Sequence, residues 1–296
     1  MSPSGCNPLG GGVRTVVINI DRDQARLAAV SKEFARSGVA FERFAAVNGL
    51  AVPEAVRPYF FGADGRPAPT LTRGEVGCYA SHLTLWRRIA QGRYGAPTLI
   101  CEDDIGLAQD FVDVLDATLR SVDEGWDIIR LSVLSNRVVW PVCRIPEGYD
   151  LVRYSKVPVR LGAYLISEQG ARKLLKPGLR TRPVDIDLAR PWELDLNVYG
   201  IDPAPVLQPT TNPSSIDAIE QRRYPRRARG VLGIPSRLLG RDRLARYWYN
   251  ARMVGAYRTV RAEIWNLFRD TPFIKSDARA VRDPKTISSR NEIVEF

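Results

Sequence analysis

The chain contains few of the residues on which several classes of protein depend. Among its 296 residues are one histidine, four cysteines and two methionines, and no apolar run approaches the roughly 20 residues that a membrane-spanning helix needs. The cysteines have neither C-x-x-C spacing nor the spacing of a zinc-ligand set. These absences argue against a spanning helix and a structural zinc site, and isolated cysteines are typical of a reducing, cytoplasmic compartment. The cysteines are Cys6, Cys78, Cys101 and Cys143.

Two further signals are missing. The first residues, MSPSGCNPLGGG, have no charged start followed by an apolar stretch, so no secretory leader is expected. No G-x-x-x-x-G-K-[ST] loop is present, which argues against a P-loop kinase or NTPase. The 23 glycines and 21 prolines follow no short period, and 45% hydrophobic residues is typical of globular chains. Collagen-like and wholly disordered chains are thereby excluded.

The formal charge of +10 is concentrated at the C-terminal end of the chain. Residues 1–217 carry 25 basic and 25 acidic side chains, whereas residues 218–296 carry 18 basic and 8 acidic ones. This asymmetry predicts a charge-balanced body with a basic extension. We therefore divide the chain into a flexible N-terminus at 1–12, a globular domain at 13–217 and a basic helical extension at 218–296.

Strand and helix patterns alternate along the globular domain as far as residue 175. Runs rich in β-branched residues, such as TVVINI, predict buried strands, and apolar residues spaced by three or four predict helices. Thr72 and Glu75 fit a capping box at the start of one helix. This order predicts an α/β fold with a mostly parallel, Rossmann-like sheet flanked by helices. Strands are expected at 15–20, 39–47, 97–101, 126–132 and 158–167, and helices at 23–37, 71–92, 111–119 and 168–175.

Three adjacent carboxylates, Glu102, Asp103 and Asp104, follow the apolar strand at 97–101. They repel one another, by about 1 kcal/mol for a pair 4 Å apart even in water. A bound hard cation would remove this repulsion, because Mg²⁺ and Mn²⁺ prefer carboxylate and phosphate oxygens. Ligands of open α/β sheets bind at the carboxyl ends of strands. The alternative is a solvated acidic loop or a helix N-terminus.

The C-terminal extension has an arginine cluster and a long helical pattern. Residues 221–230, QRRYPRRARG, hold five arginines, and residues 244–268 carry an apolar stripe with most arginines off it. Three interpretations remain open from the residues alone. The segment could bind an anionic membrane surface, pack its stripe on the globular domain, or bind nucleic acid.

The stretch LTRGEVGCYASHLTLWRRI, followed closely by LICEDDI, resembles the signature of glycosyltransferase family 25. The segments VVINIDRDQAR, FERFAAVNG, WDIIRLS, AYLISEQGARKLL, PVDIDL and NVYGIDPAPVLQ resemble further blocks of the family in the same order, over roughly residues 13–210. One departure is Arg160-Leu161, where the family tends to have Gly-Thr. This difference would change any contact that the family's Gly-Thr makes in the pocket, and it could alter the preference for an acceptor.

The resemblance implies a nucleotide-diphosphate-sugar transferase with a GT-A type, Rossmann-like sheet. In such folds an acidic motif holds Mn²⁺ (or Mg²⁺) on the diphosphate of the donor. We therefore expect Asp104 and Glu102 as metal ligands, and Asp103 or Glu102 as contacts to the ribose or to the groups around the metal. A divalent cation would stabilise the leaving diphosphate as a Lewis acid.

The resemblance also places further residues near the donor. His82, the only histidine, and Ser81 belong to its central block, and His82 would donate a hydrogen bond to the donor or its phosphate. A core histidine that is hydrogen-bonded inside the protein is the alternative. Arg22 and Arg26 follow the first strand, where they either contact the nucleotide or lie solvated in a first helical turn.

Family members of known stereochemistry invert the anomeric centre, which requires a carboxylate that removes the proton of the acceptor hydroxyl. PVDIDL makes Asp185 the first candidate base, with Asp187, Glu193 and Asp195 as alternatives. Asp185 could equally cap a helix that starts near Ile186.

The resemblance as a whole implies an inverting hexosyltransferase that uses UDP-galactose or another UDP-hexose. The acceptor would be a glycan or glycolipid of a bacterial lipopolysaccharide or related surface glycan. Lipid-linked acceptors favour an anionic membrane surface as partner of residues 218–270, and make nucleic acid an unlikely partner. The expected location is cytoplasmic and peripheral on the inner face of the membrane. A basic membrane- or nucleic-acid-binding module without transferase activity is the alternative, and a metal-dependent nucleotidyltransferase is a further rival.

Overall fold

The computed structural model describes most of the globular domain and a C-terminal helix pair. The flexible segment expected at 1–12 lies almost wholly outside the described residues, and the arginine cluster at 221–230 lies outside them entirely. None of the described helices is long and apolar enough to cross a membrane. The described residues are 12–62, 64–65, 70–95, 97–132, 135, 137–208 and 241–269.

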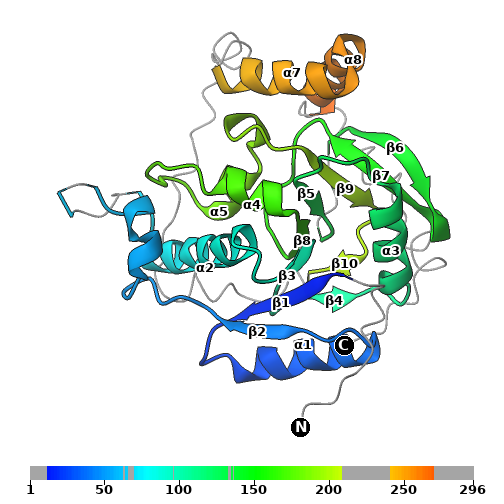
Figure 1. The fold of residues 1–296 in the computed structure, drawn as a ribbon. Coiled ribbons are helices and arrows are strands. Elements are labelled where there is room, and N and C mark those ends of the chain that lie inside the picture. The colour runs from blue at the N-terminus through cyan, green and yellow to red at the C-terminus, as the bar shows by residue number, and fades with distance from the viewer. Residues whose placement is uncertain are drawn as a thin grey trace.

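The centre of the molecule is an eight-stranded sheet in the order β2-β1-β3-β8-β5-β9-β7-β6 (Figure 1). Six of these strands point the same way, and β8 and β7 run against them. The remaining strands, β4 and β10, form a separate antiparallel pair. The predicted α/β class with a mostly parallel sheet is confirmed. The strands are β1 (Arg14–Asn19), β2 (Glu42–Ala45), β3 (Thr98–Glu102), β4 (Gly106–Leu107), β5 (Ile128–Arg130), β6 (Val139–Ile145), β7 (Tyr149–Tyr154), β8 (Ala163–Ile166), β9 (Val198–Asp202) and β10 (Val206–Leu207).

Helices cover both faces of the sheet because successive strand residues point to opposite sides. In β1, Val17 packs with α1 and α3, whereas Val16 packs with α2, α4 and α5. The capping box predicted at Thr72 and Glu75 is present and starts α2. The helices are α1 (Gln24–Arg36), α2 (Arg73–Ala90), α3 (Phe111–Ser121), α4 (Glu168–Leu174), α5 (Val184–Leu188), α7 (Arg241–Val254) and α8 (Ala256–Arg269), with 3-10 helices at Glu54–Tyr59, Pro146–Gly148 and Pro191–Glu193.

The strand expected at 158–167 begins only at Ala163, so the first part of that prediction is wrong. Arg160 and Gly162 have φ angles of 71° and 50°, in the left-handed region that an extended strand does not visit. A Cβ atom on Gly162 would lie 2.6 Å from Ser132 Oγ, so the close approach requires glycine. The chain therefore turns sharply before it enters β8.

Two other regions differ from the expected pattern. No element was expected between residues 132 and 158, where β6 and β7 pair as an antiparallel hairpin at the edge of the sheet. The single helix expected through 244–268 is two helices, because Gly255 interrupts it with a φ of 90°. The pair α7–α8 lies beyond the β9–β7–β6 end of the sheet, far from α1 and β2 (Figure 1).

Candidate active site

The carboxyl ends of β1 and β3 lie side by side and bring Asn19 and Arg26 to the acidic triplet. Asn19 Nδ2 donates a hydrogen bond of 2.7 Å to Asp103 Oδ2, and Arg26 Nη1 donates one of 3.3 Å to Asp103 Oδ1. Arg43 Nε donates to Asn19 Oδ1 at 2.9 Å. Burial raises the pKa of Asp103, and the hydrogen bond from Asn19 opposes that rise. Both carboxylate oxygens of Asp103 are therefore occupied by protein donors.

Glu102 and Asp104 share one neighbour, Gln208, which follows β10. Gln208 Nε2 donates to Glu102 Oε2 at 2.8 Å and to Asp104 Oδ1 at 3.1 Å. Arg26 Nη1 lies 3.8 Å from Asp104 Oδ2, and Glu102 forms no ion pair with a described residue. Burial, and next the charge of Asp104, raises the pKa of Glu102 to about 7. The two carboxylates thus converge without a closely bound side-chain cation.

This pair of carboxylates fits a divalent cation that is also bound to a diphosphate. Mg²⁺ takes one or two carboxylates from a protein and completes its shell with phosphate oxygens and water. Gln208 Oε1 is buried and has no hydrogen-bond partner among the described residues, so an uncommitted oxygen lies beside the pair. No group of three His, Cys, Asp or Glu side chains in the described part of the chain could hold a metal.

A three-residue segment, residues 160–162, joins the end of β3 to Asp185 on α5; we call it the 160–162 bridge. The Glu102 N–H donates to the carbonyl of Gly162 at 2.7 Å, and the Arg160 N–H donates to Asp185 Oδ2 at 3.2 Å. The charge of Asp185 contributes to the raised pKa of Glu102, after burial and the nearer acids. Asp185 forms no ion pair with any described residue, so it lies near the carboxylates of β3 with only backbone donors.

The side chains of Arg130, the last residue of β5, and Ser132, two residues later, donate hydrogen bonds to the 160–162 bridge. Arg130 Nη2 donates to the carbonyl of Arg160, and Ser132 Oγ donates to the next carbonyl at 2.6 Å. Arg130 is fully buried, and its Nε and Nη1 have no hydrogen-bond partner among the described residues. Burial lowers the pKa of Arg130, while two tyrosines, Asp185 and Glu102 oppose the shift. The buried guanidinium of Arg130 therefore lies within electrostatic range of the Asp185 and Glu102 carboxylates.

His82 lies on the inward face of α2, inside the core. Its Nδ1 is 2.8 Å from Tyr164 Oη, which also accepts a hydrogen bond of 3.0 Å from Trp86 Nε1. Burial, and next the charge of Arg130, lowers the pKa of His82 to about 3, so the ring is neutral at pH 7. The structure places this histidine in a core hydrogen-bond network; a contact with the donor stays a prediction.

Ser81 and Arg22 also contact groups outside the acidic triplet. Ser81 Oγ donates to the Gly77 carbonyl at 2.8 Å and accepts a hydrogen bond of 2.8 Å from a backbone N–H that follows β2. Arg22 Nε lies 3.8 Å from Asp23 Oδ1, and its side chain is largely exposed. Of the two arginines that follow β1, the contacts above join only Arg26 to the acids.

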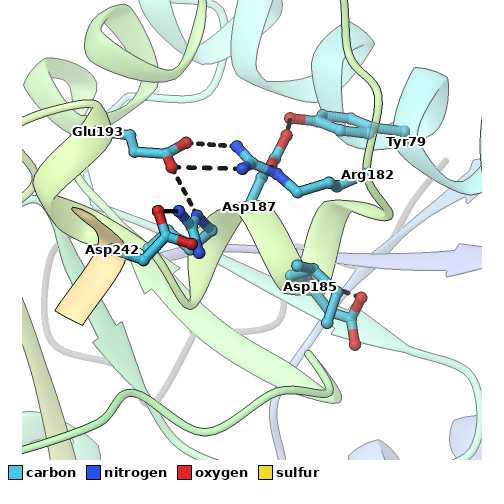
Figure 2. Close-up of polar contacts among 8 residues, drawn as sticks. Tyr79, Arg182, Asp185, Asp187, Glu193 and Asp242 are labelled. Carbon is cyan, nitrogen blue, oxygen red and sulfur yellow. Dashed lines mark hydrogen bonds and ion pairs between the residues drawn. The ribbon is translucent and has the colours of Figure 1, made fainter. Parts of the chain in front are cut away.

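The other candidate bases, Asp187, Glu193 and Asp195, each pair with arginine. Asp187 lies 2.6 Å from Arg182 Nε and also accepts a tyrosine hydroxyl at 2.8 Å. Glu193 pairs with Arg182 and with a second arginine, and Asp195 pairs with an arginine of α7. Figure 2 shows Asp185 apart from this network, facing the opposite way. Among the four, Asp185 is thus the acid whose charge no described arginine neutralises at close range.

Three residues of this site were not predicted: Asn19, Arg130 and Gln208. Asn19 and Arg130 each carried a local signal, because each is a polar residue inside an otherwise apolar strand run. Gln208 ends the segment NVYGIDPAPVLQ that resembles the family, but its contact with Glu102 depends on the pairing of β10 with β4. The structure brings together Asn19, Arg26, the acidic triplet, Arg130, the 160–162 bridge, Asp185 and Gln208.

Comparison with known proteins identifies the family of this chain. The model of glycosyltransferase family 25 (LPS biosynthesis protein) matches residues 13–188. Procollagen galactosyltransferase 1-A of Xenopus laevis is 35% identical over 139 residues, which are 45% of this chain and 21% of that protein. Procollagen galactosyltransferase 2 of Homo sapiens is 32% identical over 120 residues, 39% of this chain and 19% of that protein.

A third relative is named as an inactive member of the family. The human protein named inactive glycosyltransferase 25 family member 3 is 35% identical over 126 residues, 39% of this chain and 20% of that protein. The chain thus covers about a fifth of the length of these three relatives. The family match extends from the start of β1 through α5 and includes the acidic triplet and Asp185. This chain belongs to glycosyltransferase family 25.

Proposed function

We propose that this protein is an inverting hexosyltransferase that moves a sugar, with galactose as first candidate, from a UDP-sugar to a glycan acceptor. The acceptor would belong to a bacterial lipopolysaccharide or a related surface glycan, as the description of the family suggests. The observation that carries the proposal is the convergence of Glu102 and Asp104 on Gln208, with Asp185 held next to them by the 160–162 bridge.

Each group has a role in this proposal. Glu102 and Asp104 would hold Mn²⁺ or Mg²⁺, which when bound supplies a Lewis acid to the departing diphosphate. Asp185 takes the proton from the acceptor hydroxyl, since a backbone-held carboxylate with no arginine partner remains a competent proton acceptor. Arg26 and Asp103 line the nucleotide end of the site. The remaining predicted donor contacts are Arg22, Ser81 and His82.

The decisive experiment measures UDP release from UDP-galactose and UDP-glucose by the purified chain, with and without Mn²⁺. Asp104→Asn should lower the rate at least a hundredfold and leave the thermal unfolding midpoint unchanged within about 2 °C. Asp113→Asn, an exposed acid of α3, is the matched control and should keep the full rate. Failure to bind or turn over any UDP-sugar in the presence of Mn²⁺ would refute the transferase proposal.

A second candidate is a basic binding module on this scaffold that has no transferase activity. The relative named inactive shows that proteins of similar sequence have been assigned no activity. Salt-sensitive binding to vesicles or DNA, without any binding of UDP-sugars, would favour this candidate.

A further inference from the structure

Helix α8 presents its large apolar side chains between Tyr257 and Trp265 to solvent, whereas the small Thr259 and Ala262 are buried. Tyr257 and Trp265 are 77% and 60% exposed, and Val260 and Ile264 lie on the same exposed surface at 43% and 49%. A surface helix of a globular domain normally shows the reverse, because burial of its apolar stripe is what holds it in place. The part of the apolar stripe formed by Tyr257, Val260 and Ile264 is therefore not packed on the globular domain.

The inward side of α8 is held by polar contacts instead. Asn266 Nδ2 donates to Ser155 Oγ at 3.0 Å, and Asn266 Oδ1 accepts from a backbone N–H at 3.3 Å. Glu263 pairs with Arg243 and Arg246 of α7, each at 3.0 Å. These contacts determine which face of the helix points outward, so the exposure of the aromatic residues follows from the packing of the pair.

The outward side of α8 is positively charged as well as apolar. Arg258 and Arg261 are exposed between the aromatic residues, and neither forms an ion pair with a described residue. Glu263 is the only acid of Ala256–Asn266, and it faces α7. On the neighbouring helix, Trp248 is 69% exposed. The exposed surface of α8 thus combines aromatic and aliphatic side chains with uncompensated arginines.

We propose that the exposed face of α8 is a docking surface for a negatively charged lipid bilayer. Tryptophan and tyrosine lie preferentially at the level of lipid headgroups, and the interleaved arginines complement the charge of anionic lipids. A helix with one apolar face and a basic surround lies in the plane of such an interface without crossing it. The proposal does not depend on the transferase activity.

The helix pair is attached firmly enough to orient the rest of the protein. Tyr249 Oη donates to the Leu196 carbonyl at 2.8 Å, and Asn250 Nδ2 donates to the Ser155 carbonyl at 2.9 Å. Asp242 of α7 pairs with Arg190. Because α7 holds the segment that follows α5, a bilayer bound at α8 would keep the sheet and its carboxyl edge in a defined orientation.

The test is flotation of the full chain with vesicles of pure phosphatidylcholine and of phosphatidylcholine with 30% phosphatidylglycerol. We expect binding to the anionic vesicles that weakens with salt, and at least a tenfold loss of partitioning in Arg258→Glu/Arg261→Glu. Tyr257→Ser/Trp265→Ser should lose binding to a similar extent. Both pairs are exposed, so circular dichroism and the unfolding midpoint should match the unmodified chain.

Two matched controls keep this test specific. Arg93→Glu/Arg120→Glu makes the same change in net charge on exposed residues elsewhere, and Leu50→Ser removes an exposed apolar side chain outside α8. Both should change partitioning less than twofold. Full vesicle binding by the α8 variants would overturn the proposal, as would binding that the two charge-reversal pairs reduce equally. A concentration-dependent dimer that Trp265→Ser abolishes, with no binding to anionic vesicles, would assign the surface to a second copy of the chain.

Discussion

Asp185 and Asp187 lie two residues apart on the same short helix and have opposite surroundings. Asp187 is 6% exposed and is bound by Arg182 and by the Tyr79 hydroxyl (Figure 2). Among the described residues, Asp185 accepts hydrogen bonds only from the backbone N–H groups of Arg160 and Ile186. Arg182 neutralises the charge of Asp187, whereas no described arginine forms an ion pair with Asp185. The two positions therefore separate a carboxylate paired with arginine from the one that we propose as the base.

The largest expected effect is on turnover at Asp185. Asp185→Asn should lower the rate of UDP release by about 10²–10⁴-fold, because an amide cannot accept the proton of the attacking hydroxyl, which is that of water when no glycan acceptor is present. The free energy of unfolding should fall by less than about 1 kcal/mol, since the amide oxygen can still accept one of the two N–H bonds. Initial rates with a UDP-sugar and denaturant unfolding measure the two quantities.

Asp195→Asn gives the contrast for this prediction. Asp195 is exposed and paired with Arg252, so its removal should keep the rate within about threefold and cost under about 1 kcal/mol of stability. An equal loss of rate at Asp195, or an undiminished rate in Asp185→Asn, would contradict the assignment of the base.

The next largest effect is on stability at Asp187. Asp187→Ala should cost about 2–3 kcal/mol, because it leaves the buried Tyr79 hydroxyl without its acceptor and removes the partner of Arg182. The estimate is below that for a fully buried pair, since the Arg182 side chain is 39% exposed and partly screened. Chemical denaturation measures the change.

A double-mutant cycle sharpens this second prediction. Tyr79→Phe removes the hydroxyl that Asp187 accepts, so the double variant should lose less stability than the sum of the two single variants. Additive losses would mean that the hydrogen bond between Tyr79 and Asp187 contributes little. Below the unfolding midpoint, Asp187→Ala should retain most of its turnover, in contrast to Asp185→Asn.

The local parts of the fold could be predicted from the sequence. The apolar run that ends in Glu102 marks a buried strand followed by its acids, and Thr72 with Glu75 marks the start of α2. Such signals involve residues close in the chain, where periodicity and capping act directly. The first two strands and the helix between them were accordingly placed within a few residues of their bounds.

The parts that could not be predicted depend on contacts between distant segments. Gln208 reaches Glu102 across 106 residues, and the outward face of α8 follows from polar contacts to α7 and to Ser155. A helical stripe predicts amphipathicity but does not say which side faces the protein. The turn before β8 was likewise hidden, because Arg160 is not a residue type that signals a left-handed conformation.

The smallest expected effect tests the backbone support of Asp185. Arg160 has a φ of 71°, and its N–H donates to Asp185. Arg160→Gly should be neutral or stabilising by up to about 1 kcal/mol. Glycine adopts this conformation without strain, which favours the folded state, but it also raises the entropy of the unfolded chain, which offsets part of that gain. Arg160→Val should cost about 1–2 kcal/mol, because a β-branched side chain tolerates positive φ poorly. Denaturant unfolding of both variants checks this order.

The same two variants divide the roles of the backbone and the side chain of Arg160. If the backbone conformation alone supports Asp185, Arg160→Gly keeps the rate of UDP release within about threefold and Arg160→Val lowers it together with stability. A large loss of rate in Arg160→Gly at undiminished stability would instead assign the exposed guanidinium a direct contact with substrate. In that case an arginine side chain would serve at Asp185 as well. Asp185 and Asp187 would then differ in how close their arginine lies, and not in whether they have one.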